Sequence, residues 1–195
     1  GEMCFDNKPA FSLLSETSLR DKSVEIYSLS KAYNIPGWRI GAVLGAKNIV
    51  EKVSRVKGLV DYGIFLPIQV ASSYALTTSE DLVSPTVSIY KRRAKIMIEG
   101  LKNLGWEVVE SKSAASLWVK PVIKESNTTE WVTSLLLEHG ISVLPGEIFG
   151  DEWNQWARIA LVSDEEVLTS VLETFKNISN KKNKDSVNID SKFYV

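Results

Sequence analysis

The sequence contains very little cysteine or histidine. Cys4 is the only cysteine and His139 the only histidine among the 195 residues. A single cysteine excludes an internal disulfide, and neither residue has neighbours at the spacing of a zinc site. We interpret Cys4 as a packed thiol and His139 as a residue at a helix end. We therefore expect a reducing compartment, the cytoplasm, and no metal centre.

Long apolar runs and an excess of one charge are also missing. No stretch of about 18 apolar residues occurs, and no charged-then-apolar leader opens the sequence, so neither membrane spanning nor secretion is indicated. The 23 basic residues nearly balance the 24 acidic ones, which leaves no broad basic face for nucleic acid or anionic lipid. With 44% apolar residues, the chain can bury a core. This composition fits a metabolic enzyme.

Strand-like and helix-like segments alternate along the chain, which predicts the α/β class. Alternating and glycine-bounded apolar runs predict strands near residues 24–30 and 40–45. Helical periodicity predicts helices over residues 47–59, 66–76 and 84–104, and the last is expected to link two domains. One strip of the first helix should be buried, namely Ile49, Val50, Val53 and Val56.

The second half of the sequence has the pattern of a compact α/β sandwich. Strands are predicted near residues 106–110, 117–120, 141–144 and 157–162. Asn127 and Glu130 have capping-box spacing and open a helix that Gly140 ends. Ser163 to Glu166 should cap a final helix. The polar residues 180–195 predict a disordered tail.

The most informative segment is residues 27–41, Tyr-Ser-Leu-Ser-Lys-Ala-Tyr-Asn-Ile-Pro-Gly-Trp-Arg-Ile-Gly. Hydroxyls and a planar guanidinium are the groups that bind phosphate, and Ser28, Ser30 and Arg39 supply them. Lys31 lies between them, and nearby positive charge favours the neutral amine that attacks a carbonyl. Ser-Leu-Ser-Lys alone would equally suit a solvated lysine at a strand end, because short motifs match often by chance.

The whole segment resembles the cofactor-lysine signature of class I/II aminotransferases, the fold-type I enzymes that use pyridoxal 5′-phosphate (PLP). The resemblance implies that Lys31 binds the cofactor aldehyde covalently and moves the substrate's α-proton. It implies further that Ser28 and Arg39 bind the cofactor phosphate, with Ser30 beside it. Residues 1–12 resemble the stretch that follows the family's aspartate and tyrosine partners of the cofactor ring. We therefore expect the chain to be the C-terminal half of a longer protein.

Two further segments extend the resemblance. Arg158 matches the arginine that holds the substrate's α-carboxylate, and the alternative is an edge-strand arginine in a surface ion pair. Residues 61–69 resemble the dimer-interface loop of the alanine and aspartate transaminase-like branch, where Tyr62 approaches the neighbouring subunit's site or packs in the interface. Residues 151–156 depart from the family, because relatives commonly place a glycine near position 153. The shape of this loop is therefore open.

The resemblance implies transamination between an amino acid and a 2-oxo acid, with alanine, aspartate or glutamate-like substrates and a homodimeric full-length protein. Residues 1–80 would end the large PLP-binding domain, residues 81–179 would form the small C-terminal domain, and residues 180–195 the tail. The chain alone should bind PLP weakly and be almost inactive. Other PLP chemistry, such as a decarboxylase, lyase or synthase, stays open. So does a non-catalytic oligomerisation module derived from such an enzyme.

Overall fold

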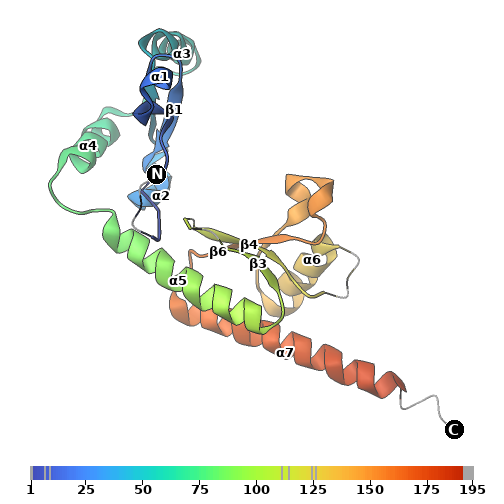
Figure 1. Cartoon of the computed structure of the whole chain (residues 1–195). Coiled ribbons are helices and arrows are strands. Elements are labelled where there is room, and N and C mark those ends of the chain that lie inside the picture. Colours follow the sequence, from blue (N-terminus) through green and yellow to red (C-terminus); the bar gives the residue numbers. More distant parts are fainter. Residues whose placement is uncertain are drawn as a thin grey trace. The chain divides into compact units, whose positions relative to one another are not determined.

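The computed structural model describes residues 2–6, 8, 10–110, 112, 113, 115–123, 125 and 127–190, with the backbone alone described over 181–190. The chain divides into two compact units, residues 1–89 and residues 90–195. Helix α5 (Ser84–Asn103) runs through the division, and Figure 1 colours the chain along its length. Among the described residues, no helix is long and apolar enough to cross a membrane.

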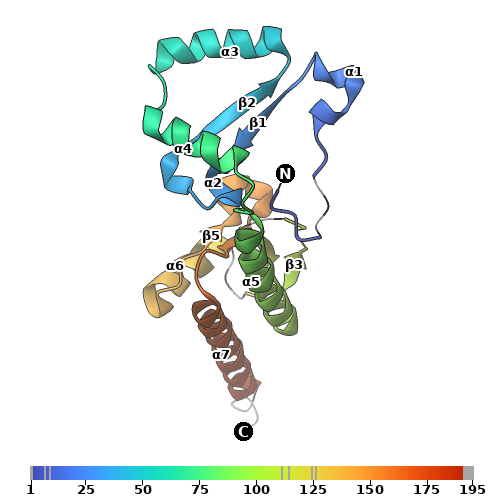
Figure 2. The ribbon, with the colours of Figure 1, turned by 90° about the vertical axis from the view of Figure 1, so that its left-hand side faces the viewer.

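The first unit is built on an antiparallel hairpin of β1 (Val24–Ser28) and β2 (Gly41–Gly45). The short turns η1 (Leu13–Ser15) and α1 (Thr17–Arg20) precede β1, and α2 (Leu29–Ala32) and the 3-10 turn η2 (Pro36–Trp38) connect the two strands. Helices α3 (Lys47–Val60) and α4 (Leu66–Thr77) follow. Because Ser28 pairs with Gly41 and Val24 with Gly45, α2 and the start of α3 lie at opposite ends of the hairpin (Figure 2).

Helix α3 forms where the periodicity predicts it, but its apolar strip is not buried. None of its residues is buried in the described structure, and Leu59 near its end is 89% exposed. Val53 and Val56, which the sequence predicts to be buried, are exposed. On the hairpin, Ile26 is 83% exposed. The prediction of a buried strip was wrong because periodicity locates an apolar face without showing what covers it. The described residues of the first unit supply no covering layer for this face.

The second unit contains an antiparallel sheet in the order β3-β4-β6-β5. The strands are β3 (Glu107–Val109), β4 (Ser116–Lys120), β5 (Leu144–Pro145) and β6 (Ala157–Ala160). Helix α6 (Thr128–His139) follows β4, the turns η3 (Gly146–Phe149) and η4 (Asp151–Trp153) connect β5 to β6, and α7 (Glu165–Asp190) ends the described chain. The arrangement is the α/β sandwich that the sequence predicts.

The core of the second unit lies on one face of this sheet. Leu117, Val119, Ala157 and Ile159 alternate with more exposed residues along β4 and β6, as one buried face requires. Helices α5 and α7 lie side by side beneath this face (Figure 1). They pack so closely that a Cβ at Gly100 would lie 2.4 Å from the side chain of Leu172.

Three aromatic residues and two helix caps complete this unit. Trp106 packs against Trp131 of α6 and Phe175 of α7, with ring centroids 5.5 and 4.9 Å away. Asn127 caps α6 through a 3.0 Å bond from the Glu130 N–H, as predicted. Helix α7 begins one residue later than Ser163 predicts, because the carboxylate of Asp164 accepts the Val167 N–H at 2.9 Å.

Helix α7 continues through Asp190, into the segment for which the composition predicts a disordered tail. Residues 177–190 contain neither proline nor glycine, so no residue of that stretch opposes the helix as strongly as these two do. Residues 191–195 lie outside the described residues.

Candidate active site

Lys31 lies in the short helix α2, directly after the end of β1. Leu29 and Ala32, at positions i and i+3 of this turn, are buried and anchor it. Lys31 occupies another side of the turn and its side chain is exposed. The buried residues therefore fix the backbone of this turn, and the primary amine of Lys31 is exposed on its surface.

Two serine hydroxyls stand beside this amine in the chain. The Ser28 Oγ accepts the Ser30 N–H at 3.2 Å and caps α2. Because the oxygen acts as the acceptor in this bond, its own O–H proton can still be donated to an anion. Ser28 is exposed and Ser30 is half-buried, so both can be reached by a phosphate.

Arg39 returns to the same end of the hairpin. Its φ of 51° places it in the left-handed region, as does the φ of 52° at Asn34, and left-handed residues other than glycine are uncommon. The guanidinium is exposed and donates from Nη1 to the Pro36 carbonyl at 3.0 Å. Because Ser28 and Gly41 are cross-strand partners, the segment from Ser28 to Arg39 closes on itself and brings hydroxyl, amine and guanidinium to one end of the sheet.

Gly41 is needed for this closure. A Cβ at this position would lie 2.6 Å from the Tyr27 carbonyl oxygen. The neighbouring Tyr27 hydroxyl donates to the carboxylate of Glu2. Burial, the Glu2 carboxylate and Tyr33 together raise the pKa of Tyr27 above its usual value. Sequence reasoning missed this contact, since no local pattern links residues 2 and 27.

A groove with a volume of about 860 Å³ runs beside the Lys31 segment, between residues 33–38 and α4. Its lining is mostly apolar and includes Tyr33, Trp38, Val70 and Tyr74. Such a lining suits side chains of another polypeptide better than a phosphate group. Trp38, which belongs to the segment 27–41, lies on the wall of this groove.

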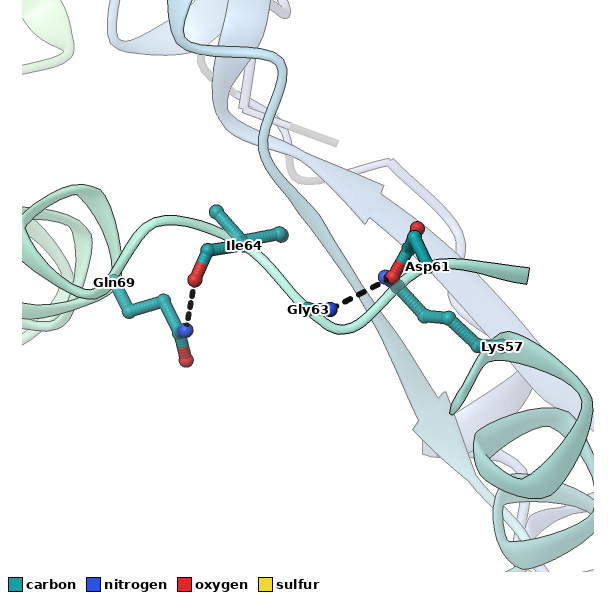
Figure 3. Close-up of polar contacts among 5 residues, drawn as sticks. All are labelled: Lys57, Asp61, Gly63, Ile64 and Gln69. Atoms are coloured by element: carbon teal, nitrogen blue, oxygen red, sulfur yellow. Dashed lines mark hydrogen bonds and ion pairs between the residues drawn. The ribbon is translucent and has the colours of Figure 1, made fainter. Parts of the chain in front are cut away.

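The loop between α3 and α4 is ordered by its own polar contacts (Figure 3). The carboxylate of Asp61 accepts the Lys57 ammonium at 2.6 Å and the Gly63 N–H at 3.1 Å, and the Gln69 side chain donates to the Ile64 carbonyl at 2.6 Å. The bond from Lys57 lowers the pKa of Asp61. Gly63 has a φ of 111°, a value that favours glycine. The loop leaves the Tyr62 side chain fully exposed.

Arg158 lies on β6, an inner strand of the sheet in the second unit. Its cross-strand partners are Trp118 on β4 and Leu144 on β5. The side chain is half-buried, and its Nε donates to the Ser116 Oγ at 3.2 Å. Within the described part of the chain Arg158 forms no ion pair. The alternative interpretation was an arginine on an edge strand in a surface ion pair. Arg158 instead lies on an inner strand and has no carboxylate partner among the described residues.

Four aromatic rings gather near Arg158. Trp118 stacks on Trp156 with an interplanar angle of 8° and a centroid distance of 6.0 Å. Its ring also meets Phe149 and Trp153 edge-on at 5.4 and 5.5 Å. Two of these residues, Trp153 and Trp156, belong to the segment 151–156 whose shape the sequence left open, and both rings pack against Trp118. In the described residues no cluster of histidine, cysteine and carboxylates suits a metal ion.

Comparison with known proteins assigns the family. Residues 1–175 match the model of the family Aminotransferase class I and II. An LL-diaminopimelate aminotransferase of Halothermothrix orenii is 36% identical over 171 residues, which cover 88% of this chain and 43% of that protein. A glutamate-pyruvate aminotransferase of Escherichia coli, AlaC, is 33% identical over 177 residues, 90% of this chain and 43% of that protein.

A solved structure shares the fold. The substrate-bound structure of BacF from Bacillus subtilis matches with a TM-score of 0.82 and 30% identity, over 90% of this chain and 44% of that one. The architecture is thus a C-terminal portion of the fold-type I α/β fold, and the chain belongs to the aminotransferase class I and II family. It spans less than half the length of the curated relatives it matches.

Proposed function

We propose that this chain provides the lysine-bearing part of a PLP-dependent aminotransferase that transfers an amino group between an amino acid and a 2-oxo acid. The observation that carries the proposal is the placement of Lys31 on an anchored turn, within a hairpin connection that also contains Ser28, Ser30 and Arg39. The aminotransferase names of the relatives support the same reaction class.

The residues of the connection fit the cofactor's functional groups. The spare O–H of Ser28, the Ser30 hydroxyl and the exposed guanidinium of Arg39 would bind its phosphate. The Lys31 amine would bind its aldehyde carbon. When bound, PLP would supply the electron sink that stabilises negative charge at the substrate's α-carbon. The Lys31 Nζ would take up the α-proton and return it, and Arg158 would orient the α-carboxylate.

The names of the relatives suggest the substrate class. They include aminotransferases named for LL-diaminopimelate and for glutamate and pyruvate, and we propose an amino acid with a 2-oxo acid such as 2-oxoglutarate. We propose further that the full-length protein acts as a cytoplasmic homodimer. The ordered loop 61–65 with the exposed Tyr62 supports an interface there. We keep the domain limits 1–80 and 81–179 as part of this proposal.

The apolar surface of the first unit supports a further element of the proposal. Leu59, Ile26 and the groove along α4 expose apolar side chains that soluble proteins normally cover. We propose that the part of the family fold that this chain does not match covers this surface. The chain by itself should therefore bind PLP weakly and show little or no transamination.

Borohydride trapping tests the proposal. The full-length protein that contains this chain is incubated with PLP, reduced with borohydride, digested and analysed by mass spectrometry. We expect the pyridoxyl label at Lys31 and a loss of that label in Lys31→Ala. Lys22→Ala is the matched control, because Lys22 is exposed just before β1 but lies outside the signature. Equal labelling of Lys22 and Lys31 would contradict the assignment.

A further inference from the structure

Arg158 shares one face of the sheet with two residues of β4. Trp118 is its cross-strand partner, and Ser116 pairs with Ala160 two residues further along β6. The intervening residues, among them Leu117 and Ile159, are buried on the other face. Successive side chains of a strand point to opposite faces. Ser116, Trp118 and Arg158 therefore point away from the helix-covered core.

The contact between Ser116 and Arg158 determines which edge of the guanidinium is left for a ligand. A guanidinium carries five N–H donors, one on Nε and four on Nη1 and Nη2. The Nε–H donates to the Ser116 Oγ at 3.2 Å. A carboxylate can bind in bidentate fashion through Nε and one Nη, or end-on through both Nη atoms. Because Nε is occupied, the end-on edge is the one that remains.

We propose that Ser116 is a positioning residue for Arg158. It holds the guanidinium through Nε so that Nη1 and Nη2 are presented together to a substrate carboxylate. This proposal rests on the carboxylate-binding role of Arg158 in the proposed function, and it adds the residue that fixes the orientation and the edge that binds.

The aromatic rings beside Arg158 also limit the movement of its side chain. Trp118 lies directly across from it in the sheet, and Phe149, Trp153 and Trp156 surround the Trp118 ring. A ring held by three others cannot rotate freely, so it forms a stiff wall next to the stem of Arg158. Sites that orient a ligand need such support, since a displacement of about 1 Å can cost much of the effect of a binding group.

The first test measures the Nε–H directly in the whole 195-residue chain. Solvent exchange of the arginine Nε protons is followed by nuclear magnetic resonance, and the Arg158 signal is assigned by its loss in Arg158→Lys. We expect slow exchange in the native chain and in Ser116→Thr, which keeps the hydroxyl. Exchange should be about tenfold faster in Ser116→Ala, because a hydrogen bond from a charged donor is lost. Ser170→Ala, an exposed serine on α7, is the matched control and should behave like the native chain.

The second test uses 2-oxoglutarate as the carboxylate probe. We expect its addition to shift the Arg158 Cζ and Nη signals while the Nε signal changes little. Ser116→Ala should weaken binding about three- to tenfold and Ser116→Thr should restore it. Equal Nε–H exchange in native and Ser116→Ala chains, or a shift of Nε as large as that of Nη, would overturn the positioning role. Undiminished binding in Arg158→Lys would instead refute the carboxylate role of Arg158 itself, which distinguishes the two failures.

Discussion

Thr128 connects α6 to the segment that leads into the Arg158 strand, and its replacement tests how that segment is held. The residue is fully buried at the start of α6. Its hydroxyl lies 2.8 Å from the Trp156 carbonyl, 2.9 Å from the Glu147 carboxylate and 3.3 Å from the Asn154 carbonyl. One O–H proton serves these three acceptors. Thr128→Val keeps the shape of the side chain and removes that proton.

The expected loss of stability in Thr128→Val depends on which hydrogen bonds remain after the hydroxyl is removed. The Asn154 carbonyl still accepts the Thr128 N–H at 2.8 Å, and the Trp156 carbonyl still accepts the Gly146 N–H at 2.7 Å. No buried carbonyl is left without a donor, so the cost should be that of a typical hydrogen bond, about 1 kcal/mol, and not the larger penalty of an unpaired group. For a unit of this size such a loss lowers Tm by about 4–8 °C.

The stability lost in Thr128→Val should depend on pH, because the Thr128 hydroxyl contacts the carboxylate of Glu147. Burial raises the pKa of this carboxyl, but bonds from its own backbone N–H, from Thr128 and from Thr129 outweigh it, so the pKa lies below the usual 4.5. A pKa lowered by folding stabilises the protein above the usual value, and this stabilisation is lost as the pH falls through the lowered pKa. The difference between the native chain and Thr128→Val should therefore be largest at neutral pH and should shrink in acid.

Differential scanning calorimetry at neutral pH and below the usual pKa of Glu147 measures both effects. Thr133→Val is the matched control, because Thr133 lies on the same helix and its hydroxyl bonds only the Thr129 carbonyl at an exposed site. We expect the control to change stability by less than about 0.5 kcal/mol. Equal Tm values for the two variants at neutral pH would refute the reasoning, as would a difference that grows in acid.

Three other substitutions or truncations give independent predictions. Gly146→Ala should lose about 3 kcal/mol in urea unfolding, because its Cβ would lie 2.1 Å from the Trp153 carbonyl oxygen; a loss below about 1 kcal/mol would contradict the clash. Asn127→Ala should lose about 1 kcal/mol in the same assay and Asn127→Asp should restore it, as expected for an N-cap. A chain of residues 84–190 should unfold cooperatively by circular dichroism and one of residues 1–83 should not, because few of the described apolar residues of the first unit are buried; cooperative unfolding of 1–83 would refute this.

Local patterns in the sequence predicted the elements of the fold well. The apolar spacing of residues 47–59 and 66–76 predicted α3 and α4 to within a residue or two, and the Asn127 cap predicted the start of α6. These signals are carried by residues within one or two helical turns. The confirmed α/β class follows from the order of such elements. The exposure of the apolar strip on α3 could not be predicted in this way. Burial depends on which other segments pack against a helix, and the local pattern does not contain that information.

The contacts that shape the candidate site join residues that lie far apart in the sequence. Ser116 and Arg158 are 42 positions apart, and Thr128 and Trp156 are 28 apart. Their meeting depends on the register of β4 on β6 and on the path of the segment before β6, and no local motif encodes either. The residues of the Lys31 segment were found because they lie within one short stretch of chain. Their roles as cofactor ligands stay a prediction.

The two units differ in how firmly they can hold a functional side chain. In the second unit the sheet under Arg158 rests on a closed core, since Leu117, Val119, Ala157 and Ile159 are all buried. In the first unit Lys31 rests on Leu29 and Ala32, while α3 has no buried residue. Any polypeptide that covers α3 and Ile26 would stabilise the first unit by mass action. The affinity for PLP, the proposed cofactor, would scale with the fraction of molecules in which the site is formed. Covering this surface should therefore strengthen the proposed cofactor binding without touching the Lys31 segment.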